Sequence, residues 1–179
     1  MLKESPVEYK IKKIWTNFYP NSIGLLYSTI TDYLGFEINE GEFKVMSLSS
    51  FGKPIYEKEL KKMFDINNFT INMDYFEFHK SPSKSFSKKL CEVFGEPYLN
   101  ISEETNFNKY ADIASSTQLI LEHTIKNLIQ KAMDLSGKRK IVLTGGVALN
   151  CKMIHSLSKQ SIFEEMIVPP SPGDSGSAI

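Results

Sequence analysis

The residues best suited to chemistry lie where an apolar segment, IVLT, runs into the pair Gly145-Gly146. Because glycine has no Cβ, a phosphate or a ribose could approach the main chain closely at this point. A helix that starts just after the glycines would add main-chain N–H donors and the positive end of its dipole, and the amide of Asn150 could reach back to a ligand. The segment TGGVALN is neither a Walker A loop nor a GxGxxG dinucleotide motif, and a ligand-free turn between strand and helix is the competing interpretation.

A second glycine-bracketed loop, VPPSPGDSG, follows another apolar segment later in the chain and carries an acid, Asp174. An aspartate at this point could cap a helix, or it could be a metal ligand or hold metal-bound water near a phosphate. In α/β sheets, ligands bind beyond the carboxyl ends of the strands. Two such loops after neighbouring strands would converge on one crevice, and the pair therefore favours a nucleotide site.

Hydrophobic periodicity predicts the elements that must position the two loops. Apolar residues at helical spacing indicate helices, short apolar runs indicate buried strands, and the alternation around Asn72-Met73-Asp74 indicates a β-hairpin. The expected helices are residues 23–36, 42–48, 55–64, 87–94, 108–136 and 148–159, the expected strands are 140–144 and 165–168, and the expected hairpin is 69–79. The closing order of helix, strand, helix and strand predicts an α/β fold with a strand–crossover–strand unit.

Composition narrows the range of partners. The chain has 179 residues, enough for one domain with its own core, and its 21 basic and 21 acidic side chains cancel. We therefore expect no nucleic-acid partner and no membrane partner attracted by net charge. No apolar run approaches the roughly 18 residues of a membrane span, and no signal peptide is visible at the N-terminus. Cys91 and Cys151 form no metal-binding pair in the sequence and are expected to be reduced thiols of a cytoplasmic protein.

Four segments of the chain resemble the O-carbamoyltransferases of nodulation-factor and antibiotic tailoring, whose nucleotide-binding domain is similar to the tRNA threonylcarbamoyladenosine enzymes. The segments are FYPNSIGLLYSTITDYLGFEINEGEFKVMSLSSFG, YADIASSTQLILEHTI, IVLTGGVALNCKM and FEEMIVPPSPGDSGSAI. They stand in the family's order and at similar spacing, and residues 55–105 are the less distinctive part. The resemblance implies an α/β fold of the actin and Hsp70 type, related to ribonuclease H. Residues 1–179 would form an incomplete nucleotide-binding domain, without the family's N-terminal strands and C-terminal domain.

The resemblance also implies a reaction and a set of site residues. The family makes carbamoyl-adenylate from carbamoyl phosphate and ATP and transfers the carbamoyl group to a hydroxyl of a sugar or another small molecule. The positions that match the family's nucleotide-binding residues are Gly24, Ser28, Gly145, Gly146 and Asn150. Asp174 matches one ligand of a divalent metal, iron or magnesium, while Glu42 and Lys44 lie in the family's GE-x-KVMGLAPYG signature.

The sequence departs from the family's pattern at several points. The family's HxxxH metal-binding motif is absent, and His79, His123 and His155 do not match its histidines. MSLSSFG stands where MGLAPYG is usual, and CKMIHSL stands where a small helix start containing Asn-Gly is common. We therefore expect the chain alone to be catalytically silent, and apolar surface left by absent strands could drive its self-association. The alternative function is a nucleotide-binding or sugar-kinase-like module of the same superfold, without carbamoyl chemistry.

Overall fold

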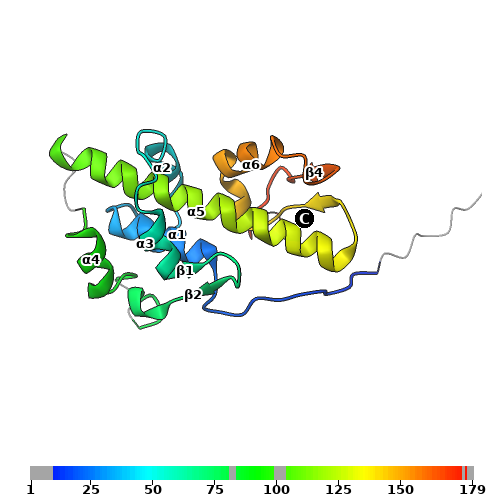
Figure 1. Cartoon of the computed structure of the whole chain (residues 1–179), viewed down its shortest axis with the longest axis horizontal. Coiled ribbons are helices and arrows are strands. Elements are labelled where there is room, and N and C mark those ends of the chain that lie inside the picture. The colour runs from blue at the N-terminus through cyan, green and yellow to red at the C-terminus, as the bar shows by residue number, and fades with distance from the viewer. Residues whose placement is uncertain (1–9, 81–83, 99–103, 175, 177–179) are drawn as a thin grey trace, which may run out of the picture.

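The computed structural model describes residues 10–80, 84–98, 104–174 and 176. A single long helix, α5 (Glu104–Ser136), runs through the middle of the molecule, and the other elements pack around it (Figure 1). The remaining α-helices are α1 (Ile23–Tyr33), α2 (Glu42–Leu48), α3 (Glu57–Met63), α4 (Lys88–Phe94) and α6 (Cys151–Ser158). The strands and 3₁₀ turns are β1 (Phe64–Asp65), β2 (Thr70–Ile71), η1 (Met73–Tyr75), β3 (Lys140–Val142), η2 (Gly146–Leu149) and β4 (Glu165–Ile167).

Helix α5 confirms the longest helix predicted from periodicity, and its apolar stripe is the centre of the core. The buried members of the stripe are Ile113, Thr117, Ile120, Leu121, Thr124, Ile125, Ile129 and Met133. Helices α1, α2, α3 and α6 all contact α5. Burial of each large aliphatic side chain stabilises the folded state by about 1.5–3 kcal/mol, so the stripe accounts for the position of α5 at the centre.

The predicted start of α1 is also confirmed, and it is fixed by a side-chain cap. Ser22 Oγ accepts a hydrogen bond from the main-chain N–H of Leu25 at 3.4 Å, which satisfies one of the free donors at the helix start. The helix then buries Leu26 and Ile30 completely in the core. The first turn of α1 is thereby held beside the second half of the chain.

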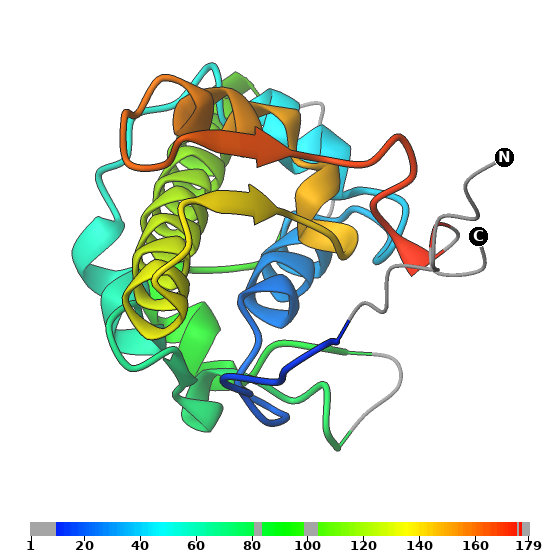
Figure 2. The same cartoon turned by 90° about the vertical axis from the view of Figure 1, so that its right-hand side faces the viewer.

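Strands β3 and β4 form a parallel pair with α6 as the crossover between them, which confirms the mixed α/β class (Figure 2). Ile141 and Met166 pack against the core, whereas Val142 and Ile167 are 65% and 49% exposed. Parallel sheets are usually covered on both faces. The described residues leave this face of the β3–β4 pair exposed, with Val142 and Ile167 beside the ion pair of Lys140 and Glu165.

The helix predicted over residues 148–159 begins later than expected. The glycine pair is followed by the 3₁₀ turn η2, and α6 starts only at Cys151. The reason is the side chain of Asn150, whose Oδ1 accepts from the main-chain N–H of Met153 at 2.8 Å and so caps α6 at this residue.

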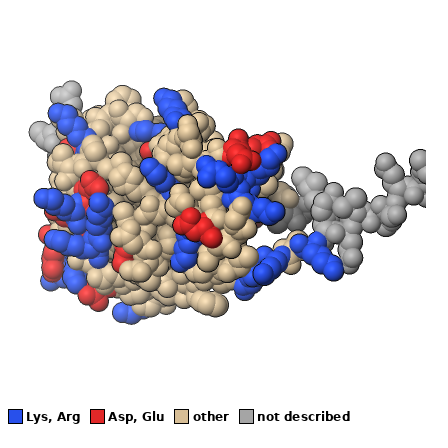
Figure 3. Space-filling view, turned by 45° about the vertical axis from the view of Figure 1, so that its right-hand side comes forward, with Lys and Arg blue, Asp and Glu red and all other residues tan. Residues whose placement is uncertain are grey.

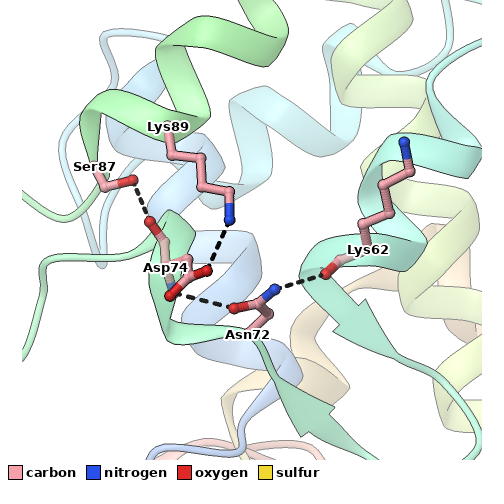
Figure 4. A network of polar contacts seen from close by, with 5 residues as sticks. All are labelled: Lys62, Asn72, Asp74, Ser87 and Lys89. Atoms are coloured by element: carbon pink, nitrogen blue, oxygen red, sulfur yellow. Dashed lines mark hydrogen bonds and ion pairs between the residues drawn. The ribbon is translucent and has the colours of Figure 1, made fainter.

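The hairpin predicted over residues 69–79 was wrong. Strand β2 pairs instead with β1, through Phe64 with Ile71 and Asp65 with Thr70. The Asn72 side chain accepts a hydrogen bond from the N–H of Asp74 at 3.2 Å and starts η1 where the hairpin's turn was expected. The side chains of helix α4 and its cap hold this turn, because Ser87 donates to the Asp74 carbonyl and Lys89 pairs with the Asp74 carboxylate, each at 2.7 Å (Figure 4).

The face seen in Figure 3 carries charges of both signs. The sequence has equal numbers of basic and acidic residues, 21 of each. Within the ranges that the structure describes, none of the helices combines the length and the apolar character needed to cross a membrane.

Candidate functional site

Most of the predicted site residues line one cleft, with a volume of about 690 Å³. The predicted residues among its lining are Gly24, Ser28, Gly146, Asn150 and Asp174. The cleft lies between the start of α1, the segment that leads into α2, and the two glycine-bracketed loops. Gly145 is not part of the lining, although it directly precedes Gly146. Segments more than 100 residues apart in the sequence therefore meet at this cleft.

The two glycine-bracketed loops are joined by main-chain hydrogen bonds. The N–H of Leu143 donates to the carbonyl of Ile167 at 2.9 Å, which extends the β3–β4 ladder. Two residues further on, the N–H of Gly145 donates to the carbonyl of Pro172 at 2.6 Å. The convergence expected from the sequence is thus built by the parallel pair itself, because both loops leave the sheet at its carboxyl edge.

The two adjacent glycines serve different purposes. Gly145 has φ 99° and ψ 164°, a conformation that side-chain-bearing residues rarely adopt. Gly146 does not lie in this region of positive φ. A Cβ atom built on either residue would meet no atom within 4 Å. The backbone conformation therefore requires glycine at 145, whereas at 146 its absence of a side chain leaves space in the cleft.

Asn150 lines the cleft, but its amide is already engaged with the protein. Its Nδ2 donates to Gln118 Oε1 at 2.9 Å, and its Oδ1 accepts from Gln118 Nε2 at 3.1 Å as well as capping α6. Sequence reasoning did not identify Gln118, which is 2% exposed on α5. The only local signal is a polar amide beside the apolar stripe of that helix. Asn150 consequently links α5 to the start of α6 and holds this part of the cleft lining in place.

Tyr27 is a second cleft residue that the sequence did not single out. It lies within the helix expected over residues 23–36, and it is 5% exposed. Its hydroxyl donates to Gln118 Oε1 at 3.1 Å. Tyr27 and Asn150, which both line the cleft, therefore share one buried partner.

Burial raises the pKa of the Tyr27 hydroxyl above its ordinary value, and the neighbouring Asn150 side chain opposes this only in part. Because the folded state holds the proton to higher pH than the unfolded chain, the associated stability is present below about pH 10 and is lost as the pH rises further. We expect the free energy of unfolding to fall above pH 10, and Tyr27→Phe to make that fall less steep. Urea unfolding at a series of pH values measures both slopes. Equal slopes in the two proteins would contradict the prediction. Burial also raises the pKa of Tyr33, so the free energy of unfolding of the Tyr27→Phe variant should still fall somewhat above pH 10.

The wall opposite the glycine loops carries carboxylates. Glu42, at the start of α2, accepts hydrogen bonds from Ser28 Oγ at 2.8 Å and from the N–H of Asn39 at 3.0 Å. Ser28 is therefore tied to the α2 segment across the cleft mouth. Glu40 also lines the cleft, whereas Lys44 lies over the rings of Phe36 and Phe43 instead.

The same cleft has an apolar side. Phe43 and Leu149 line it and remain 60% and 64% exposed. Met46 of α2 also lines the cleft, and its sulfur lies 3.7 Å from that of Cys151 at the start of α6. A ligand with one apolar or planar face and several polar groups would match this combination of walls.

The described residues do not form a complete metal site. Asp174 is exposed at the cleft, but no group of three or more His, Cys, Asp or Glu residues in the described ranges is placed to hold a metal ion. None of the three histidines lines the cleft, and His123 instead lies 4.0 Å from Glu57. The donor set therefore does not fit the implied metal without ligands from elsewhere.

The sequence profile of the carbamoyltransferase N-terminus family matches residues 4–179. The chain belongs to this family. An uncharacterized protein of Synechocystis sp. is 34% identical over 92% of the chain and 27% of its own length. Nodulation protein NolNO of Sinorhizobium fredii is 27% identical over 95% of the chain and 24% of its own length. Nodulation protein NolO of Bradyrhizobium diazoefficiens is 26% identical over 89% of the chain and 27% of its own length.

The chain spans about a quarter of the length of these curated relatives. The match to the family covers both glycine-bracketed loops and the segments that form the opposite wall of the cleft. Family membership therefore applies to the whole candidate site.

Proposed function

We propose that this chain is the nucleotide-binding part of a carbamoyltransferase, with ATP or carbamoyl-adenylate bound in the cleft between α1, α2 and the two glycine-bracketed loops. The observation that carries the proposal is the convergence of Gly24, Ser28, Gly146, Asn150 and Asp174 on this cleft. Family membership supports the transferase class. The parallel β3–β4 pair with its crossover helix is compatible with the proposed fold of the actin and Hsp70 type.

The cleft supplies features that a nucleotide requires. The open space over Gly146 allows a phosphate or ribose to approach the main chain. Phe43 and Leu149 offer an apolar face for a base. The carboxylates of Glu40 and Asp174 would disfavour a bare phosphate and favour one that is accompanied by a cation. We therefore propose that ATP binds as its complex with a divalent metal.

In the proposed reaction, carbamoyl phosphate, ATP and water give carbamoyl-adenylate, with release of inorganic phosphate and pyrophosphate. The hydroxyl oxygen of a sugar or another small molecule then attacks the carbamoyl carbon. A new C–O bond to the acceptor forms, the bond between the carbamoyl carbon and the phosphate oxygen breaks, and AMP leaves. The hydroxyl proton must pass to a base, which we do not assign within the described residues. The role proposed for this chain is to bind and orient the adenylate. We propose Asp174 as one metal ligand, and since the described residues do not complete the donor set, no step is assigned to the metal.

Calorimetric titration with ATP, with and without Mg²⁺, tests the proposal on the chain as it stands. We expect binding that depends on Mg²⁺ and that Asp174→Ala weakens about tenfold, equivalent to about 1.4 kcal/mol. Glu165→Ala, which removes an exposed carboxylate on β4 outside the cleft lining, is the matched control. Absence of ATP binding by the unmodified chain would refute nucleotide binding by this part of the protein. Equal affinities of the two variants would refute the role of Asp174.

A further inference from the structure

The buried side chain of Gln118 connects the two walls of the cleft without lining it. It lies in the middle of α5 and is 2% exposed. Its Oε1 accepts from the Tyr27 hydroxyl on α1 and from Asn150 Nδ2 before α6. Its Nε2 donates to Asn150 Oδ1 and to Glu122 Oε1, at 3.1 and 2.9 Å. Every hydrogen-bonding capacity of this amide is therefore used within the protein.

The carboxylate of Glu122 determines which way the Gln118 amide is oriented. The Glu122 carboxylate can only accept hydrogen bonds, so the group of Gln118 that faces it must be the NH₂. The carbonyl oxygen of Gln118 must then face Tyr27, whose hydroxyl donates to it. A flipped amide would leave a carbonyl oxygen against a carboxylate oxygen in a partly buried place, which is unfavourable.

The orientation passes from Gln118 to Asn150. Because the two amides pair reciprocally, a fixed Gln118 allows only one arrangement of Asn150, with Nδ2 toward Gln118 Oε1 and Oδ1 toward Gln118 Nε2. In that arrangement Asn150 Oδ1 also caps the first turn of α6 through the N–H of Met153. The end of the GGVALN segment is thereby held against α5.

We infer that Gln118 is a positioning residue of the cleft, which holds the Asn150 amide and the Tyr27 hydroxyl in the arrangement that binds the nucleotide. This inference rests on the proposed function for the nature of the ligand. Gln118 acts through its two partners and does not touch the ligand, because it is buried behind them. Loss of the amide lets Asn150 turn and loosens the loop that carries Gly146.

A double-mutant cycle on ATP affinity tests this inference, with Gln118→Leu and Asn150→Ala as the two changes. In the otherwise unmodified chain, Gln118→Leu should weaken ATP binding about tenfold. In the Asn150→Ala background it should weaken binding less than about twofold, because its main route to the ligand is gone. Equal losses in both backgrounds would overturn the inference.

Thr117→Val is the matched control. It removes a buried hydroxyl from the neighbouring position of α5, where Thr117 Oγ1 donates to the carbonyl of Ile113 within the same helix. It should leave ATP affinity unchanged even if it lowers stability, and thermal unfolding of all variants separates the two effects. If Gln118→Leu does not fold, Gln118→Met replaces it, because methionine matches the length of glutamine and likewise removes both the acceptor for Asn150 Nδ2 and the donor to Asn150 Oδ1.

An NMR measurement on the ligand-free chain decides the positioning role independently of ATP. The Asn150 side-chain amide signals, assigned by their loss in Asn150→Ala, should shift strongly in Gln118→Leu and remain in place in Thr117→Val. Unmoved Asn150 signals in Gln118→Leu would overturn the inference. If the unmodified chain binds no ATP, the proposed function fails, while shifted signals would still establish that Gln118 positions Asn150.

Discussion

Gly146→Val is expected to weaken ATP binding by about 100-fold or more while changing the free energy of unfolding little. The steric block costs affinity because the added methyl groups occupy the space that the ligand needs. A Cβ at this position meets no protein atom within 4 Å, and the residue does not require positive φ. The folded chain can therefore accept the side chain, and only the ligand is excluded. Calorimetry with ATP and urea unfolding measure the two quantities.

Gly145→Ala provides the contrast for this experiment. Residue 145 has φ 99°, so alanine is strained there and should cost about 1–3 kcal/mol of stability. The neighbouring substitutions are thus expected to separate, one lowering affinity and the other lowering stability. If Gly146→Val binds ATP as tightly as the unmodified chain, the ligand does not pass over Gly146 and the proposed position of the nucleotide is wrong.

Gly52→Ala is expected to lower the free energy of unfolding by about 3 kcal/mol, in the upper range for overpacking of a well-packed site. A Cβ on Gly52 would overlap the main-chain carbonyl of Ala111 on α5, and backbone cannot move aside as a flexible side chain can. The loop after α2 is fixed to α5 at this point by two hydrogen bonds. The N–H of Lys53 donates to the Asp112 carboxylate at 2.6 Å, and the N–H of Tyr56 donates to Ser116 Oγ at 3.0 Å.

The control is Gly24→Ala, which makes the same chemical change where there is room. A Cβ on Gly24 would lie 3.4 Å from Ser22 Oγ and 3.6 Å from Val147 Cγ2, which are ordinary contacts. Alanine is favoured over glycine inside a helix by up to about 1 kcal/mol, so this variant should be as stable as the unmodified chain or slightly more so. Urea unfolding of the two variants measures the difference. A loss below about 1 kcal/mol for Gly52→Ala would show that the loop can leave α5 at little cost.

Much of this molecule follows from local patterns. The apolar stripe of α5 and the cap of α1 at Ser22 are visible in the sequence because a helix repeats every 3.6 residues and its cap lies next to it. The unit formed by β3, α6 and β4 and its two glycine-bracketed loops is also visible in the sequence, because short apolar runs indicate the strands and the glycines follow them directly. The convergence of those loops follows from the rule that parallel strands present their carboxyl ends at one edge.

The sequence patterns did not predict the local backbone conformation where a side chain from a distant part of the chain stabilises it. The hairpin predicted around Asn72 was wrong because Ser87 and Lys89 of a later segment hold Asp74 in a 3₁₀ turn. The start of α6 was placed too early because Asn150 caps it while paired with Gln118, 32 residues earlier in the chain. Neither contact has a periodic signature.

The sequence alone therefore determined the family, the two loops and the candidate residues Gly146 and Asp174, because each is written in a short contiguous motif. Only the tertiary structure showed that α1 and α2 form the opposite wall of the cleft, and that Tyr27, Gln118 and Asn150 share one buried network. The physical reason is that packing of α1, α2 and α6 on α5 sets these distances. A hydrogen bond between side chains far apart in the chain exists only once that packing has brought them together.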